Sequence, residues 1–153
     1  MTMPKVGSPA PDFELQTDCG ETIRLRDLRG RRLVLYFYPK ADTPGCTTEA
    51  CGFRDDFSQF EKRNVLVLGI SPDDVRRQSR FKGKYALPFT LLADPDHKVC
   101  QAYGVWGKKK LMGKEYMGVL RTTFLIDEQG KISRVFEGVR PEGHSREVLA
   151  ALG

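Results

Sequence analysis

Residues 32–51 read RLVLYFYPKADTPGCTTEAC, and they carry an apolar strand directly into a helix. The run that follows Arg32 and ends at Tyr38 is continuously apolar and rich in aromatic residues. Such a run is typical of a strand covered on both faces, as in a parallel sheet. Pro39 ends the strand. A helix is predicted to begin at Pro44, because proline suits the first helical turn and the preceding Thr43 suits the N-cap.

The segments on either side continue this alternation of strands and helices. Ser71 is expected to cap the helix after the second strand, with Pro72 in its first turn. The complete predicted order is a hairpin around Gly20, a strand at 32–38, a helix at 44–62, a strand at 64–70, a helix at 71–85, a strand at 89–94, a short helix ending at Gly104, a glycine- and lysine-rich loop at 104–119, a hairpin at 121–139 and a helix at 144–152. This order predicts a single α/β domain, residues 1–153, in which helices cover a mixed sheet.

The bulk composition is that of an ordinary soluble protein. Hydrophobic residues make up 40% and charged residues 29% of the chain, and the net charge is +5. Because the lysines and arginines are scattered, no nucleic-acid partner is expected. The first residues, MTMPKVGSPAPDF, do not resemble a signal peptide, and no run of about 18 apolar residues could cross a membrane. We therefore expect a cytoplasmic protein without a membrane partner, in a compartment that keeps thiols reduced.

Cys46 falls in the first turn of the predicted helix. In that turn the backbone N–H groups have no helical partners and the helix dipole is positive, so both favour a thiolate over a thiol. Free cysteine is also often a small buried core residue. The position behind a Pro-Gly pair suggests a partly open site instead, and it favours the reactive interpretation.

Cys51 lies five residues after Cys46. In an intact α-helix the Cα atoms of such a pair are roughly 8.7 Å apart, beyond the ~7 Å limit for a disulfide. The two thiols could therefore bond only if the first turns of the helix unwound. The alternative is that Cys51 is simply a buried helix residue beside Ala50 and Phe53.

Three segments together resemble the peroxiredoxins. Pro39, Thr43 and Cys46 reproduce the pattern Pro-x-x-x-Thr-x-x-Cys of that family. The segments YFYPKADTPGCTTEAC, GVWGKKKLMGK and RTTFLID are similar to its peroxiredoxin Q branch, also called bacterioferritin comigratory protein. The resemblance covers nearly the whole chain, and it implies a thioredoxin-like fold with an added N-terminal β-hairpin.

The resemblance also implies a role for each matching residue. Cys46 corresponds to the cysteine that attacks the peroxide, and Cys51 to the resolving cysteine of those members that carry it on the same helix. Thr43 corresponds to the hydroxyl that binds the peroxide, Pro39 to the proline that shields the thiolate, and Arg121 to the fixed positive charge beside it. These roles describe a thiol peroxidase for hydrogen peroxide and organic hydroperoxides, recycled by thioredoxin or a similar dithiol. No cofactor or metal is implied, and a disulfide within one chain is compatible with a monomer.

Two other functions remain open from the residues alone. A general thiol–disulfide oxidoreductase could share the fold, although the chain lacks a Cys-x-x-Cys motif. A zinc or redox-sensing module could use Cys46, Cys51, His97 and Cys100, although their spacing is unusual for zinc.

Cys100 is expected to be a core residue or a second resolving cysteine, and Cys19 to lie exposed in a turn. His97 and His144 are not expected to be catalytic. The Lys-rich loop is expected to bring Trp106, Met112, Tyr116 or Met117 to the wall of the site.

Overall fold

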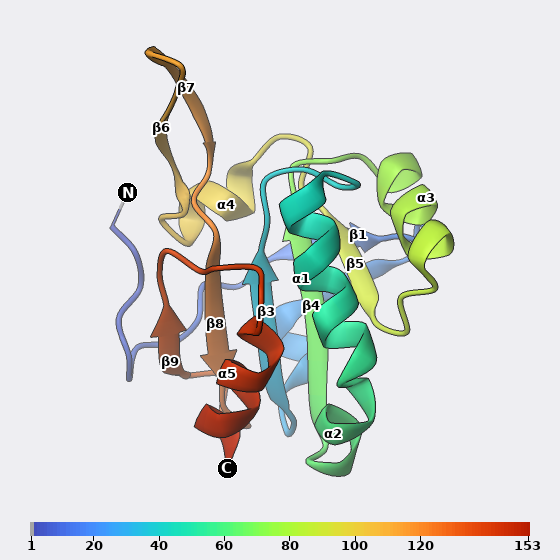
Figure 1. Cartoon of the computed structure of the whole chain (residues 1–153). Helices are drawn as coiled ribbons and strands as arrows, with labels where there is room; N and C mark the ends of the chain where they lie inside the picture. Colours follow the sequence, from blue (N-terminus) through green and yellow to red (C-terminus); the bar gives the residue numbers. More distant parts are fainter. Residues whose placement is uncertain (1) are drawn as a thin grey trace.

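The computed structural model describes residues 2–153, which form a central seven-stranded sheet and a separate two-stranded hairpin (Figure 1). The sheet has the order β2-β1-β5-β4-β3-β8-β9. Its strands are β1 (Glu14–Thr17), β2 (Thr22–Arg24), β3 (Arg32–Phe37), β4 (Val65–Ser71), β5 (Thr90–Ala93), β8 (Thr122–Ile126) and β9 (Ile132–Phe136). The helices are α1 (Pro44–Asp55), α2 (Phe57–Lys62), α3 (Val75–Tyr85), α4 (Lys98–Ala102) and α5 (His144–Leu152), with a 3₁₀ turn η1 (Leu25–Leu28).

The sheet is mixed, as the sequence predicts. Strands β3, β4 and β5 are parallel, and β8 runs antiparallel beside β3. The hairpin β1–β2, turning at Gly20, adds to β5 at the other side. Strand β3 is buried on both faces because every side chain after Arg32 is covered. Strand β3 is therefore an interior strand between β4 and β8, and α1 follows from its carboxyl end.

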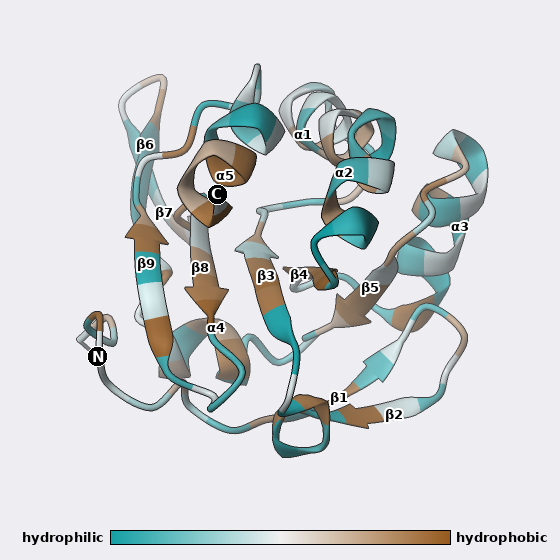
Figure 2. Ribbon diagram, turned by 90° about the horizontal axis from the view of Figure 1, so that it is seen from below, coloured by the Kyte–Doolittle hydropathy of each residue, from teal (hydrophilic) through white to brown (hydrophobic). Residues whose placement is uncertain are grey.

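The sheet separates two hydrophobic cores. Alternate residues of β3 point to opposite faces: Val34 and Tyr36 belong to the core under α1, α2, α3 and α5, whereas Leu35 and Phe37 belong to the core under α4. Viewed from below, the central strands are mainly hydrophobic, while α2 and α3 carry hydrophilic surfaces (Figure 2). None of the helices formed by residues 2–153 has both the length and the apolar composition that a membrane span requires.

Two predicted helix boundaries were wrong. The helix predicted at 44–62 is interrupted at Asp56, whose backbone leaves the helical region between α1 and α2. The Asp56 carboxylate accepts a hydrogen bond from Ser145 Oγ at 2.7 Å, so a contact with α5 accompanies the break. The next helix starts at Val75 and not at Ser71, which still belongs to β4. Asp74 is the cap, because its carboxylate accepts from the Arg77 N–H at 2.9 Å.

The segment predicted as a loop at 104–119 is a β-hairpin. Strands β6 (Trp106–Leu111) and β7 (Lys114–Val119) pair antiparallel and project beyond the sheet (Figure 1). The two-residue turn Met112-Gly113 has positive φ at both positions, as a type I′ turn requires. The turn residue Met112 is 95% exposed. The predicted elements at 121–139 and 144–152 are confirmed as β8, β9 and α5.

Candidate active site

Cys46 lies in the first turn of α1, and its side chain faces the sheet. Thr43 precedes the helix in extended conformation and Pro44 begins it, as predicted. The prediction of a partly open thiol was wrong, because Cys46 is only 1% exposed. The reason is helical periodicity: Cys46, Ala50 and Phe53 share the face of α1 that packs on the core.

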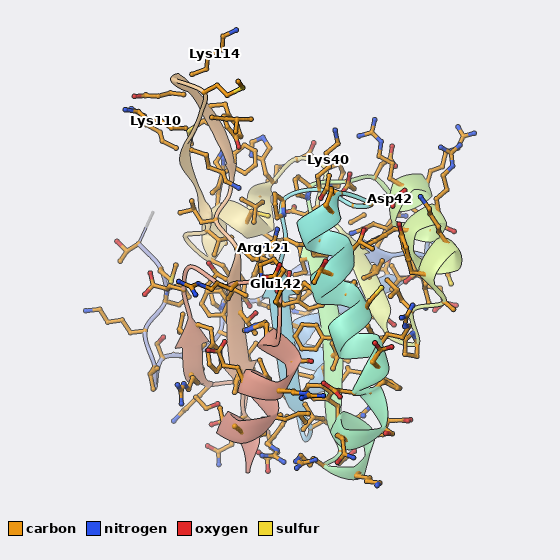
Figure 3. All side chains as sticks on the ribbon, viewed as in Figure 1. Lys40, Asp42, Lys110, Lys114, Arg121 and Glu142 are labelled. Carbon is orange, nitrogen blue, oxygen red and sulfur yellow. The ribbon has the colours of Figure 1, made fainter. Side chains whose placement is uncertain are left out.

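Arg121 places a positive charge beside this thiol. It directly precedes β8, which pairs with β3, so the residue lies next to the first turn of α1 (Figure 3). Its Nη2 donates to Cys46 Sγ at 3.5 Å. Gly45 permits this approach, since a Cβ atom at that position would lie 3.1 Å from Nη2. Burial opposes the charged guanidinium, but Cys46 and Glu49 outweigh burial and raise the pKa of Arg121. The guanidinium is therefore a permanent cation at the sulfur.

Glu49 completes a buried triad that the sequence analysis missed. Arg121 Nη1 donates to Glu49 Oε1 at 2.7 Å, and the glutamate side chain is inaccessible to solvent. Burial raises the pKa of Glu49 to about 7, although Arg121 acts in the opposite direction. Its Oε2 has no hydrogen-bond partner among residues 2–153. The available signal was its spacing, because a residue three positions after Cys46 lies on the same helix face.

Thr43 and Pro39 line a cavity of about 340 Å³ at the same end of the sheet. The Thr43 hydroxyl donates to the Lys40 carbonyl at 2.8 Å, and it makes no capping hydrogen bond to the helix. Its position at the N-cap is confirmed, but the expected side-chain cap is absent. The hydroxyl oxygen retains its acceptor capacity toward a ligand.

The projecting hairpin forms the other wall of this cavity. Trp106, Tyr116 and Met117 line it, as predicted, whereas Met112 lies at the distant tip. Lys109 also lines the cavity, and its Nζ donates to the Val119 carbonyl at 2.9 Å. Burial, followed by the nearby Arg121, lowers the pKa of Lys109. The cavity thus combines polar groups at its edge with an apolar, aromatic wall.

Cys51 lies on the same unbroken helix as Cys46, and both are thiols. Cys51 is partly exposed, so it is not the fully buried residue of the alternative interpretation. Five residues of α-helix hold the two Cα atoms roughly 8.7 Å apart. A disulfide between them requires a change in the helix.

Among residues 2–153, no other cysteine and no histidine forms a hydrogen bond with Cys46 or Arg121. Cys100 belongs to the opposite core, where burial raises its thiol pKa, so the structure does not support it as a second resolving cysteine. Cys19 is exposed in the first hairpin. His97 stacks on Trp106 with ring centroids 4.0 Å apart, and His144 is buried against Thr123.

A metal site is not formed by the residues considered for it. Cys46 and Cys100 lie on opposite faces of the sheet. Within residues 2–153 no three His, Cys, Asp or Glu side chains are grouped as metal ligands. The zinc hypothesis is therefore wrong for these four residues. The site instead offers a nucleophilic sulfur, a fixed cation and a cavity that a small electrophile can enter.

Comparisons with known proteins agree with this chemistry. The AhpC/TSA family matches residues 6–135. Peroxiredoxin Bcp of Escherichia coli is 50% identical over 145 residues, which are 95% of this chain and 93% of the relative. Peroxiredoxin Bcp of Bacillus subtilis is 48% identical over 148 residues, 97% of this chain and 94% of the relative.

Solved structures extend the comparison to the fold. The bacterioferritin comigratory protein of Xanthomonas campestris, solved in a study of its alkyl peroxide reduction activity, superposes with a TM-score of 0.87 at 37% identity. The alignment covers 92% of this chain and 89% of that protein. The predicted thioredoxin-like architecture is confirmed.

Proposed function

Since the chain belongs to the AhpC/TSA family and is a thiol peroxidase, we propose that Cys46 is the residue that attacks the peroxide. The observation that carries this assignment is the 3.5 Å contact between Arg121 Nη2 and Cys46 Sγ. A guanidinium beside the sulfur favours the thiolate, which is the nucleophilic form. The other three cysteines have no arginine at hydrogen-bond distance from sulfur in the described part of the chain.

In the first step the Cys46 thiolate attacks one oxygen of the peroxide. A sulfur–oxygen bond forms, the O–O bond breaks, and the second oxygen leaves as water or an alcohol after taking up a proton. Arg121 stabilises both the thiolate and the negative charge that moves onto the leaving oxygen. Thr43 accepts a hydrogen bond from the peroxide, and Pro39 closes the cavity without presenting an N–H group. The product is a sulfenic acid on Cys46.

In the second step the Cys51 thiol condenses with this sulfenic acid. A disulfide forms and water leaves, so the peroxide has oxidised two thiols. Helix α1 must open between the two residues, because they are too far apart in the intact helix. A thioredoxin-type dithiol then restores both thiols by exchange and becomes oxidised itself.

The cavity supports organic hydroperoxides as substrates alongside hydrogen peroxide. Its wall of Trp106, Tyr116 and Met117 offers apolar contact to an alkyl group. The alkyl peroxide reduction of the Xanthomonas campestris relative is in keeping with this assignment. The chain acts as a single domain and as a monomer in the cytoplasm, because an intramolecular disulfide needs no second copy and a thiol-based cycle suits a reducing compartment.

The test is peroxide turnover with thioredoxin and its reductase. Wild type, Cys46→Ser and Cys51→Ser are compared, with Cys100→Ser as a matched control from the opposite core. Cys46→Ser should abolish turnover, because a serine hydroxyl is barely ionised at neutral pH. Cys51→Ser should retain one round of peroxide consumption without recycling by thioredoxin. Substantial turnover by Cys46→Ser would refute the assignment.

A further inference from the structure

A second cavity lies beside the helix that carries both cysteines. Its volume is about 590 Å³, and it is formed by the loop before α1 and by α3. Lys40 and Asp42, which belong to this loop, are labelled near the start of α1 in Figure 3. The floor is apolar, with Phe81 almost completely buried and Ala41 beside it. We call this cavity the α3 pocket.

The rim of the α3 pocket carries positive charge that no acidic residue within 2–153 pairs with. Arg77 and Arg80 are exposed and three residues apart, so they project from the same face of α3. Neither forms an ion pair with any residue from 2 to 153.

The acidic residues of the pocket are already engaged. Asp42 pairs with Lys84 at 2.9 Å and accepts from the Tyr85 hydroxyl at 2.8 Å. Asp73 is buried, and its Oδ2 accepts from the Ala41 N–H and the Ser71 hydroxyl, each at 2.7 Å. The free charge at the rim is therefore cationic.

The loop that forms one wall of the α3 pocket leads directly into α1, the helix that carries Cys51. Arg54 lies three residues after Cys51 and therefore on the same side of α1. Its Nη1 donates to the Tyr85 carbonyl at 2.9 Å, at the end of α3. Tyr85 in turn holds Asp42 in the pocket wall. Cys51 is thus about one helical turn from the contact that joins α1 to the end of α3, and the segment that must open for the disulfide begins at the wall of the α3 pocket.

We propose that the α3 pocket is the docking surface of the dithiol reductant, and that the face of the reductant around its thiols is acidic with an apolar residue at its centre. This inference rests on the proposed function, since the Cys46–Cys51 disulfide is the bond to be reduced. An acidic face complements Arg77 and Arg80, and an apolar side chain fits the Phe81 floor. A thiolate of the docked protein attacks the disulfide, releasing one chain thiolate and forming a mixed disulfide. The second reductant thiol breaks that bond, so both cysteines are reduced and the reductant is oxidised.

The experiment separates reduction from oxidation. Protein is converted to the Cys46–Cys51 disulfide with diamide, verified by mass spectrometry, and reduced under stopped flow by an acidic thioredoxin or by dithiothreitol. The variant R77E/R80E is compared with wild type and with Arg31→Glu, an exposed arginine just before β3 at the opposite end of that strand.

We expect R77E/R80E to be reduced by thioredoxin at least tenfold more slowly at low salt, with the difference shrinking at about 0.5 M salt. Reduction by dithiothreitol and oxidation by peroxide should be unchanged, and Arg31→Glu should behave as wild type.

Equal thioredoxin rates for wild type and the double variant would overturn the proposal. So would an equal loss in Arg31→Glu, because the effect would then be one of net charge. Slower oxidation by peroxide with normal reduction would assign the two arginines to substrate binding instead. Failure of wild type to be oxidised by peroxide would refute the proposed function and leave the diamide measurement valid.

Discussion

Replacing Glu49 by glutamine should flatten the pH dependence of stability. Burial raises the pKa of Glu49 from 4.5 in an unstructured chain to about 7 in the folded protein. The folded state therefore binds the proton more tightly than the unfolded state. The stabilising contribution is complete below pH 4.5 and is lost as the pH rises through about 7. Integrating over about pH 5 to 8 gives a loss of ~2.5 kcal/mol in the free energy of unfolding of wild type from this group.

Glutamine is a close isostere that cannot titrate. Its side-chain oxygen can still accept from Arg121 Nη1, but its amide nitrogen would lie where Glu49 Oε2 has no partner among residues 2–153. That buried, unpaired donor lowers the free energy of unfolding by about 1–3 kcal/mol at every pH. It therefore shifts the plot of stability against pH without changing the slope of the plot. Other titrating groups, among them the buried His144, are present in both proteins and cancel in the difference.

The assay is urea denaturation of wild type and Glu49→Gln at four pH values between about 5 and 8, with the free energy of unfolding extrapolated to water. The wild-type value minus the variant value should fall by ~2.5 kcal/mol across that range. A difference that stays constant within about 0.5 kcal/mol would show that Glu49 is ionised over this whole pH range. The inference that the buried carboxyl group takes up a proton in the folded protein would then be refuted.

Three further changes probe the thiol and its helix. Arg121→Ala should slow alkylation of Cys46 by iodoacetamide at neutral pH roughly tenfold, because a charge-assisted contact to sulfur is lost. An unchanged rate would show that Arg121 does not influence the reactivity of the thiol. Gly45→Ala should lower kcat/KM for peroxide several-fold with a nearly unchanged Tm, since its Cβ would lie 3.1 Å from Arg121 Nη2; wild-type kinetics would show that the guanidinium has room to move. Oxidation should remove the protection of backbone amides against hydrogen exchange across residues 46–52. Gly52→Ala, which stabilises the helix by roughly 1 kcal/mol, should slow disulfide formation and increase the over-oxidation of Cys46 seen by mass spectrometry. Equal amide exchange in the reduced and oxidised proteins would exclude unwinding.

The sequence was sufficient for the order of elements around Cys46. The apolar run at 32–38, the Thr-Pro pair and the three- and four-residue spacings after it are local signals, because a strand or helix is largely set by its own periodicity and caps. The same locality placed Cys46 and Cys51 on one helix, too far apart to bond while it is intact. Prediction from local signals failed at the hairpin 106–119, because lysines obscured the alternation and Met-Gly is an uncommon sequence for a type I′ turn.

Only the tertiary structure brought Glu49 and Arg121 together, although they are 72 positions apart in the chain. Pairing of β8 beside β3 carries Arg121 to the start of α1, and packing of α1 on the core buries Cys46 and Glu49. Burial also decides the chemistry of the carboxyl group, because the cost of an ionised acid depends on the solvent that the fold excludes. Sequence spacing determines which residues share a face of one helix. Which charges meet across elements, and in what dielectric, depends on how those elements pack.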